Sequence, residues 1–227
     1  IGMSQDGLAA FEPAFVDELA VIMEWAFRYL QKDGEGDPDE RTWLRDETGG
    51  SVYLRLTTNP IEQPGKRHDA AFVQGSIDGA YWLRKPGPNS EIVIAYQGSV
   101  APEAIKAAGT LAENRRDVGV LAVTSADRLN AGWTAAQRAR SHGNASAKSH
   151  IETLLDVVSN QCKIVTVIDG HPATLAWLGA VNGHQTIPLG VEHFGQTGTI
   201  QDLYRHFGID AETIVKKAIG LTAGHKP

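Results

Sequence analysis

The chain has 227 residues, with 21 Lys and Arg against 27 Asp and Glu and a formal net charge of −6. This length allows one large domain or one domain and part of another, and the acidic balance without a dense basic run argues against a nucleic-acid surface. The single Cys162 excludes a disulfide framework within the chain and predicts a reduced, cytoplasmic setting, and no apolar run is long enough to predict a membrane partner.

The first part of the chain predicts only a fragment of a fold. Residues 13–31 form a helix with Pro13 in its first turn, and its broad apolar face indicates packing on two sides. A strand is predicted over 51–58, and the prolines of 59–67 end it. One helix and one strand cannot close a core. Because the chain also opens on Ile1, we expect a piece of a longer protein that begins in the tail of a preceding domain.

The remainder alternates strands with helices. Continuous Val/Ile runs between helices indicate a mostly parallel sheet covered on both faces. We therefore predict an α/β fold, a three-layer α/β/α sandwich on a five-stranded sheet. A short turn joins its first two strands, so the first should be an edge strand antiparallel to the second. The predicted strands are 79–85, 91–99, 118–126, 163–170 and 186–191, and the predicted helices are 102–115, 150–158 and 172–181.

The closing stretch HFGQTGTIQDLYRHFGID, residues 193–210, carries helix-start and helix-stop signals. Thr199 with Asp202 reads as a capping box, Gly208 ends that helix, and Asp210 caps a last helix over 211–219.

No motif in the chain predicts an active site on its own chemistry. The glycine-rich DGEGD of 33–37 lacks the strand and helix that a phosphate loop needs. His171 follows a predicted strand, where open parallel sheets place functional groups, but a polar loop histidine is the simpler interpretation. Ser125 lacks the GxSxG context of a nucleophile.

Five segments together resemble the transketolase superfamily. The closing stretch resembles its C-terminal signature FG.SG....LL..FGI, and FEPAFVDELAVIMEWAF resembles the helix after RPAD.NE in transketolases or DPAYAYE in the homodimeric decarboxylating component of pyruvate dehydrogenase. SVYLRLTTNPIEQP resembles the strand that closes the pyrimidine-binding domain. IVIAYQGSVAPEAIKAAGTLAE and VGVLAVTSADRLNAGW resemble the start of the C-terminal domain.

The resemblance implies an enzyme that depends on thiamine diphosphate and magnesium and works as a homodimer. Residues 1–64 would end the pyrimidine-binding domain, 65–72 would be a linker, and 73–227 would be the C-terminal domain. The diphosphate-binding domain and the glutamate that activates the cofactor would lie upstream. We therefore expect no catalytic, cofactor-binding or metal-binding residue on this fragment, which alone should be inactive.

Two residues carry an implied substrate role. Thr57 stands where sugar-phosphate transketolases have the phosphate-gripping arginine of SRQN, and a hydroxyl cannot replace that cation. LTT instead resembles the ITT of the pyruvate dehydrogenase component, which favours decarboxylation of a 2-oxo acid and an acyltransferase component as partner. Arg55 is an alternative source of the charge, but strand alternation would keep it on the same face as Thr57 only two residues earlier. Asp6 resembles the aspartate of an EDG loop that contacts the donor substrate.

Alternatives remain beside this interpretation. One is a transketolase that acts on sugar phosphates, and another is a non-catalytic binding or dimerisation module. The direct join of Gly7 to Leu8 is also unusual, because both family branches have a histidine-bearing loop and a helix there. Either the protein has lost this loop, or residues are missing at this join. We expect the second, because a deletion would remove a helix that the core of the pyrimidine-binding domain needs.

Overall fold

The structure is a computed structural model that describes residues 5, 7–32, 48–65, 68–114 and 116–223. Its contacts divide the chain into two compact units. One comprises Ile1–Tyr81 with Val123–Leu154, and the other comprises Trp82–Ala122 with Leu155–Pro227. The domain boundaries predicted from the sequence, 1–64 and 73–227 around a linker, stay a prediction.

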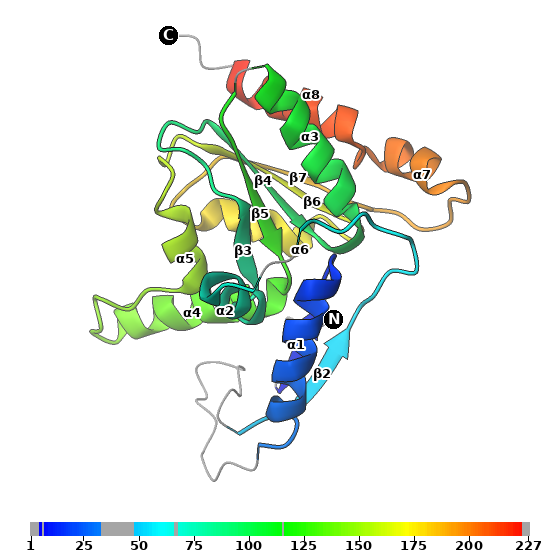
Figure 1. Cartoon of the computed structure of the whole chain (residues 1–227). Coiled ribbons are helices and arrows are strands. Elements are labelled where there is room, and N and C mark those ends of the chain that lie inside the picture. Colours follow the sequence, from blue (N-terminus) through cyan, green and yellow to red (C-terminus); the bar gives the residue numbers. More distant parts are fainter. Residues whose placement is uncertain (1–4, 6, 33–47, 66–67, 115, 224–227) are drawn as a thin grey trace. The chain divides into compact units, whose positions relative to one another are not determined.

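The first unit contains a two-stranded parallel sheet. Leu8 pairs with Ser51 at one end of this sheet, and Phe11 pairs with Leu54 at the other. Helix α1 lies beside the sheet (Figure 1). The elements of this unit are β1 (Leu8–Phe11), α1 (Val16–Tyr29), β2 (Ser51–Leu54), α2 (Ala70–Asp78), α4 (Ala126–Ser141) and α5 (His150–Leu155).

One face of α1 forms the core of this sheet. Ile22 and Tyr29 are buried against Phe11 of β1, and Trp25 stacks on Tyr29 with ring centroids 4.5 Å apart. The guanidinium of Arg128 in α4 lies 4.7 Å from the centroid of Trp25, within range of a cation–π interaction. The helix predicted over 13–31 is confirmed, with shorter ends.

The second unit holds most of a five-stranded sheet in the order β3-β5-β4-β6-β7. Ala80 and Tyr81 of β3 and Val123 of β5 belong to the first unit. β4 pairs with β6 in parallel, and β6 pairs with β7 in parallel. One strand pair is antiparallel, and the predicted α/β fold class is confirmed. The elements are β3 (Ala80–Arg84), β4 (Ile92–Gln97), η2 (Gly98–Val100), α3 (Ala101–Glu113), β5 (Val118–Val123), β6 (Lys163–Ile168), α6 (Ala173–Ala176), η3 (Trp177–Ala180), β7 (Thr186–Leu189), α7 (Ile200–Phe207) and α8 (Ala211–Ala223).

The antiparallel strand is β3, and its neighbour differs from the predicted one. β3 lies at the edge as predicted, but it pairs with β5 and not with β4, the next strand in sequence. The amides of Thr124 and Ser125, just after β5, both donate to the carbonyl of Gly79, just before β3. The short connection therefore spans β5 and is not a hairpin turn. Pro188 lies in β7 at the other edge, where a missing N–H costs least.

Helices cover the sheet of the second unit. Every residue of β4 and of β5 is buried, which requires cover on both faces. α3 and α8 lie side by side (Figure 1) and pack on β4 and β6, while α6 contacts β6 and β7.

The two Phe-Gly pairs of the closing stretch differ in role. Thr199 accepts a hydrogen bond from the amide of Asp202, and Gly208 ends α7 with a φ of 68°, as predicted. Asp210 accepts from the amide of Thr213 and caps α8, also as predicted. Phe194, by contrast, is 99% exposed. The second pair is therefore a helix stop, and the first belongs to an exposed loop.

Three local features differ from the sequence-based elements. β1 was not predicted, because four residues carry little periodicity. The helix α2 was not predicted either, and it begins at Ala70, inside the predicted linker, where Asp69 caps it by accepting from the amide of Phe72. β2 ends at Leu54 and not at residue 58, because its partner β1 ends at Phe11, which pairs with Leu54.

Candidate functional site

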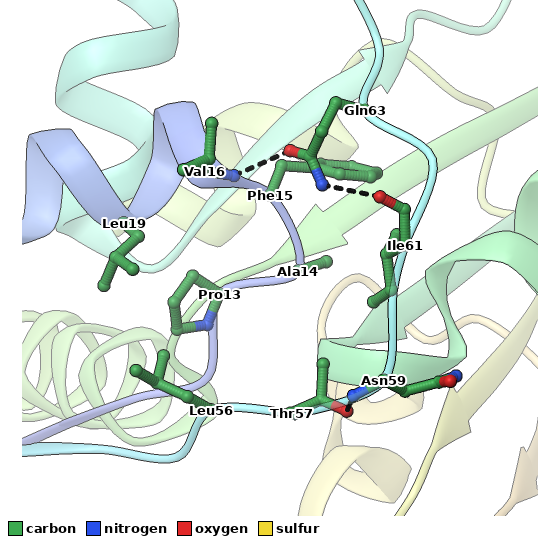
Figure 2. A pocket seen from close by; sticks show the side chains of 10 residues that line it. All are labelled: Pro13, Ala14, Phe15, Val16, Leu19, Leu56, Thr57, Asn59, Ile61 and Gln63. Carbon is green, nitrogen blue, oxygen red and sulfur yellow. Dashed lines mark hydrogen bonds between the residues drawn. The ribbon is translucent and has the colours of Figure 1, made fainter.

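A pocket lies at the carboxyl ends of β1 and β2. Two segments form its walls: the turn that leads from β1 into α1, and the extended segment that follows β2 (Figure 2). Its volume is about 200 Å³. The ends of parallel strands are where α/β folds place ligands. The lining residues are Pro13, Ala14, Phe15, Val16, Leu19, Leu56, Thr57, Asn59, Ile61 and Gln63.

The structure places Thr57 in this pocket, beyond the end of β2. Its hydroxyl accepts a hydrogen bond of 3.0 Å from the amide of Asn59. β2 ends at Leu54, so neither Arg55 nor Thr57 lies in the strand on which the predicted shared face rests. Asp6, the other predicted substrate residue, and the DGEGD segment lie outside the described residues.

The Gln63 side chain joins the two walls of the pocket. Its Oε1 accepts a hydrogen bond of 2.8 Å from the amide of Val16, and its Nε2 donates a hydrogen bond of 2.8 Å to the carbonyl of Ile61 (Figure 2). The first bond satisfies a free N–H at the start of α1, while the second holds the extended segment in place. Gln63 therefore fixes the width of the pocket, a role that sequence reasoning missed.

The pocket is uncharged, but an ion pair lies beside it. None of the ten described lining residues carries a charged side chain. Arg55, which precedes Leu56, donates 2.6 Å from Nη1 to Oε1 of Glu12, which precedes Pro13. The amide of Arg55 also donates 2.9 Å to the carbonyl of Phe11. Arg55 is thus held through its backbone by Phe11, the last residue of β1, and through its side chain by Glu12, which follows it.

A buried carboxylate shapes the turn that enters α1. Oε2 of Glu18 accepts hydrogen bonds from the amides of Ala14, at 2.7 Å, and Phe15, at 2.9 Å. Burial raises the pKa of Glu18, while hydrogen bonds from Tyr81 and these amides act in the opposite direction. The signal in the sequence was an acidic residue in the first turn of a helix.

Ser125 and His171 have structural contacts. The hydroxyl of Ser125 donates 2.6 Å to the carbonyl of Ala10 and accepts from the amide of Arg128, as the cap of α4. His171 is exposed, and its Nδ1 accepts from the amide of Ala173 at the start of α6. Ser125 therefore acts as a helix cap, and His171 contacts the backbone at the start of α6.

A second polar cluster lies in the other unit, after β4 and β6. The hydroxyl of Tyr204 donates 3.3 Å to Ser99, and Ser99 donates 3.1 Å to Asp169. These bonds attach α7 to the ends of two neighbouring strands, so we assign the cluster a structural role. Among the residues that the structure describes, no three His, Cys, Asp or Glu side chains gather as a metal site.

A match to a family of known domains identifies the family of this chain. Residues 79–210, more than half of the chain, match the family described as the transketolase-like TK C-terminal domain. The chain belongs to this family. No curated protein matches the chain. Within the described ranges, no helix combines the length and the apolar character needed to cross a membrane.

Solved structures share the fold of this transketolase-like chain. A transketolase variant from Pichia stipitis in complex with fructose 6-phosphate is 17% identical, with a TM-score of 0.64, over 98% of this chain and 26% of its own. The transketolase of Leishmania mexicana is 18% identical, with a TM-score of 0.61, over 97% and 26%. A split-gene transketolase, an inactive β4 tetramer, is 16% identical, with a TM-score of 0.56, over 97% and 60%. The chain thus spans about a quarter of the first two.

Proposed function

We propose that this chain is the C-terminal part of a thiamine-diphosphate enzyme that decarboxylates a 2-oxo acid. The observation that carries the proposal is the uncharged pocket around Thr57. A phosphorylated substrate needs fixed cations, and a guanidinium binds phosphate through two parallel hydrogen bonds. The one arginine next to the pocket in sequence, Arg55, is already paired with Glu12. A 2-oxo acid with an alkyl end suits this lining better.

The comparisons by themselves favour a second candidate, a transketolase that acts on sugar phosphates. All three solved structures described above are transketolases, and one of them holds fructose 6-phosphate. At 16–18% identity these structures establish the fold and not the substrate. The choice between the candidates therefore depends on the side chains around the pocket.

The test is an assay of the full-length parent enzyme with thiamine diphosphate and magnesium. Pyruvate, branched 2-oxo acids and xylulose 5-phosphate are offered separately, and CO₂ release and ketol transfer are both measured. We expect CO₂ from at least one 2-oxo acid. Ketol transfer from xylulose 5-phosphate without any 2-oxo acid turnover would establish the second candidate instead.

We propose that the cofactor and its magnesium belong to the upstream part of the parent. The resemblance to transketolases implies that the diphosphate-binding domain lies upstream of this chain, so no step that involves the cofactor is assigned to the described residues. Thiamine diphosphate with magnesium, added to this chain in a calorimeter, should produce no binding heat. Micromolar binding would contradict this division of roles.

A third candidate is a non-catalytic binding or dimerisation module. The inactive split-gene tetramer shares the fold and suits this interpretation. The sequence of the parent gene distinguishes the module from an enzyme. The gene of an enzyme should encode, upstream of this chain, a Gly-Asp-Gly motif with a later asparagine. A parent without that motif would favour the module.

We further propose a cytoplasmic homodimer with an acyltransferase component as partner. The cytoplasmic setting follows from the cysteine usage, because Cys162 is the single cysteine of the sequence and is buried and free. Exposed apolar side chains along one face of α1, among them Val16, Phe27 and Leu30, support the homodimer. The acyltransferase follows from the decarboxylation proposal alone, and co-sedimentation of the parent with such a component would test it.

A further inference from the structure

The ion pair beside the pocket joins two segments that the pocket needs. Glu12 comes just before Pro13, the first residue after β1 that lines the pocket. Arg55 comes just before Leu56, the first residue after β2 that lines it. The pair therefore lies where the two walls of the pocket leave the parallel strands.

Stability alone is a weak explanation for this pair. The Arg55 side chain is 46% exposed, and a pair in which one partner is solvated contributes little to folding. The Glu12 side chain, at 11% exposure, is much less accessible. A carboxylate with so little solvent around it keeps its cationic partner close, because an unpaired buried charge is costly.

The pair has a direct consequence for ligand charge. With Glu12 in place, Arg55 and the carboxylate together present no net charge next to the pocket. A phosphate that approached would have to displace the carboxylate from the guanidinium and remain beside it, and two anions at that distance repel. Specific sites often gain selectivity by such unfavourable contacts with the wrong ligand.

We propose that Glu12 is a specificity determinant of this pocket: it holds Arg55 in an ion pair and thereby excludes phosphorylated groups. The pocket then accepts an uncharged, largely apolar end of a substrate. This inference rests on the proposed function and adds the positioning residue that enforces it. Glu12 touches no substrate itself and acts through Arg55.

The test is a phosphate titration of this chain, followed by NMR at the backbone amides of Thr57 and Asn59. The probe is inorganic phosphate at constant ionic strength, with chloride as the reference anion. The wild type should show only weak shifts that do not saturate. Glu12→Gln frees the charge of Arg55 and should bind phosphate at least about tenfold more tightly.

Three further variants separate charge from structure. Glu12→Asp keeps the carboxylate and should behave like the wild type. Glu12→Gln combined with Arg55→Gln should lose the gained binding. Glu12→Ala is a second way to release Arg55 and keeps the test decisive if Glu12→Gln fails to fold.

Two results would overturn the inference. One is a folded Glu12→Gln or Glu12→Ala chain that binds phosphate no more tightly than the wild type. The other is a gain in binding that persists without Arg55. The titration needs no turnover, so either result leaves the proposed decarboxylation to be judged by the assay of the parent. A parent without 2-oxo acid activity would overturn that function, while the gain in phosphate binding would still support the ion pair's role.

Discussion

The hydroxyl of Tyr81 donates a hydrogen bond of 2.6 Å to Oε1 of Glu18, a residue 63 positions away in the chain. Glu18 is 1% exposed, and its carboxylate also accepts hydrogen bonds from the amides of Ala14 and Phe15. Three donors therefore depend on one buried acceptor. This arrangement fixes the turn that forms one wall of the pocket.

Removal of the Glu18 carboxylate should destabilise the chain strongly. Glu18→Ala leaves one hydroxyl and two amides without a partner, and we expect a loss of about 2–4 kcal/mol in the free energy of unfolding. Glu18→Gln preserves an acceptor for the amides and should cost less than about 1 kcal/mol. Urea denaturation measures both. Equal losses for the two variants would show that shape, and not hydrogen bonding, holds the turn.

Asp127 should make the stability of the chain depend on pH. Burial raises its pKa from 3.8 to about 6. Because the folded pKa lies above the unfolded one, Asp127 contributes stability below pH 4, and the contribution is lost as pH rises through 6. Relative to the wild type, Asp127→Asn should therefore gain stability between pH 4 and pH 7, by at most about 3 kcal/mol.

Urea denaturation at pH 4 and pH 7 measures this difference. Glu212→Gln is the matched control, since Glu212 is an exposed acid in the first turn of α8. The control should show a much smaller pH dependence. If Asp127→Asn followed the wild type at both pH values, the carboxylate would have to be solvated in the folded chain.

Glu152 should show the opposite dependence on pH. Burial would raise its pKa, but hydrogen bonds from Arg140 and Ser149 outweigh burial and lower it. A lowered pKa means that stability is present above pH 4.5 and lost as pH falls through the folded pKa. Glu152→Gln should cost about 1–3 kcal/mol at pH 7 and progressively less below pH 4.

The same denaturation series tests Glu152→Gln, with Glu24→Gln as the control. Glu24 forms an exposed ion pair with Arg28, and such pairs contribute little. A cost that stayed constant from pH 7 to pH 3 would exclude the charged pair as its origin.

The sequence predicts the second unit better than the first. Its strands are continuous Val/Ile runs, and its last helices have local signals at Thr199, Gly208 and Asp210. The strand order escaped prediction because pairing depends on long-range packing. A short connection between β3 and β4 permits a hairpin, and only the structure shows β5 between them.

The candidate site was predictable only in part. The resemblance pointed to Thr57, which lines the pocket. The contacts that shape the pocket, Gln63 to Val16 and Arg55 to Glu12, join residues more than forty positions apart. Side-chain partners at such separations leave no periodic pattern, because each residue alone reads as an ordinary surface group.

One face of α1 offers a surface for the proposed homodimer. Val16 is 60% exposed, Phe27 57% and Leu30 52%. With Ala20 and Met23 they follow one another at steps of four, three, four and three residues, the spacing of helices that pair along a seam. The opposite face, with Ile22 and Tyr29, is already buried in the first unit. The broad apolar face of this helix predicts packing on two sides. The buried face packs in the first unit, and we propose that the exposed stripe packs against a second copy of the chain.

Phe27→Glu should dissociate the dimer. A charge at the centre of this stripe would have to be buried in the pairing seam, which is costly without a partner. Phe27 is exposed in the single chain, so its own fold should lose less than about 0.5 kcal/mol. Sedimentation velocity at micromolar concentration should show a dimer for the wild type and a monomer for the variant. Gln201→Glu, an equal charge change on exposed α7, should remain dimeric. A wild type that sediments as a monomer, or a variant that stays dimeric, would remove α1 from the interface.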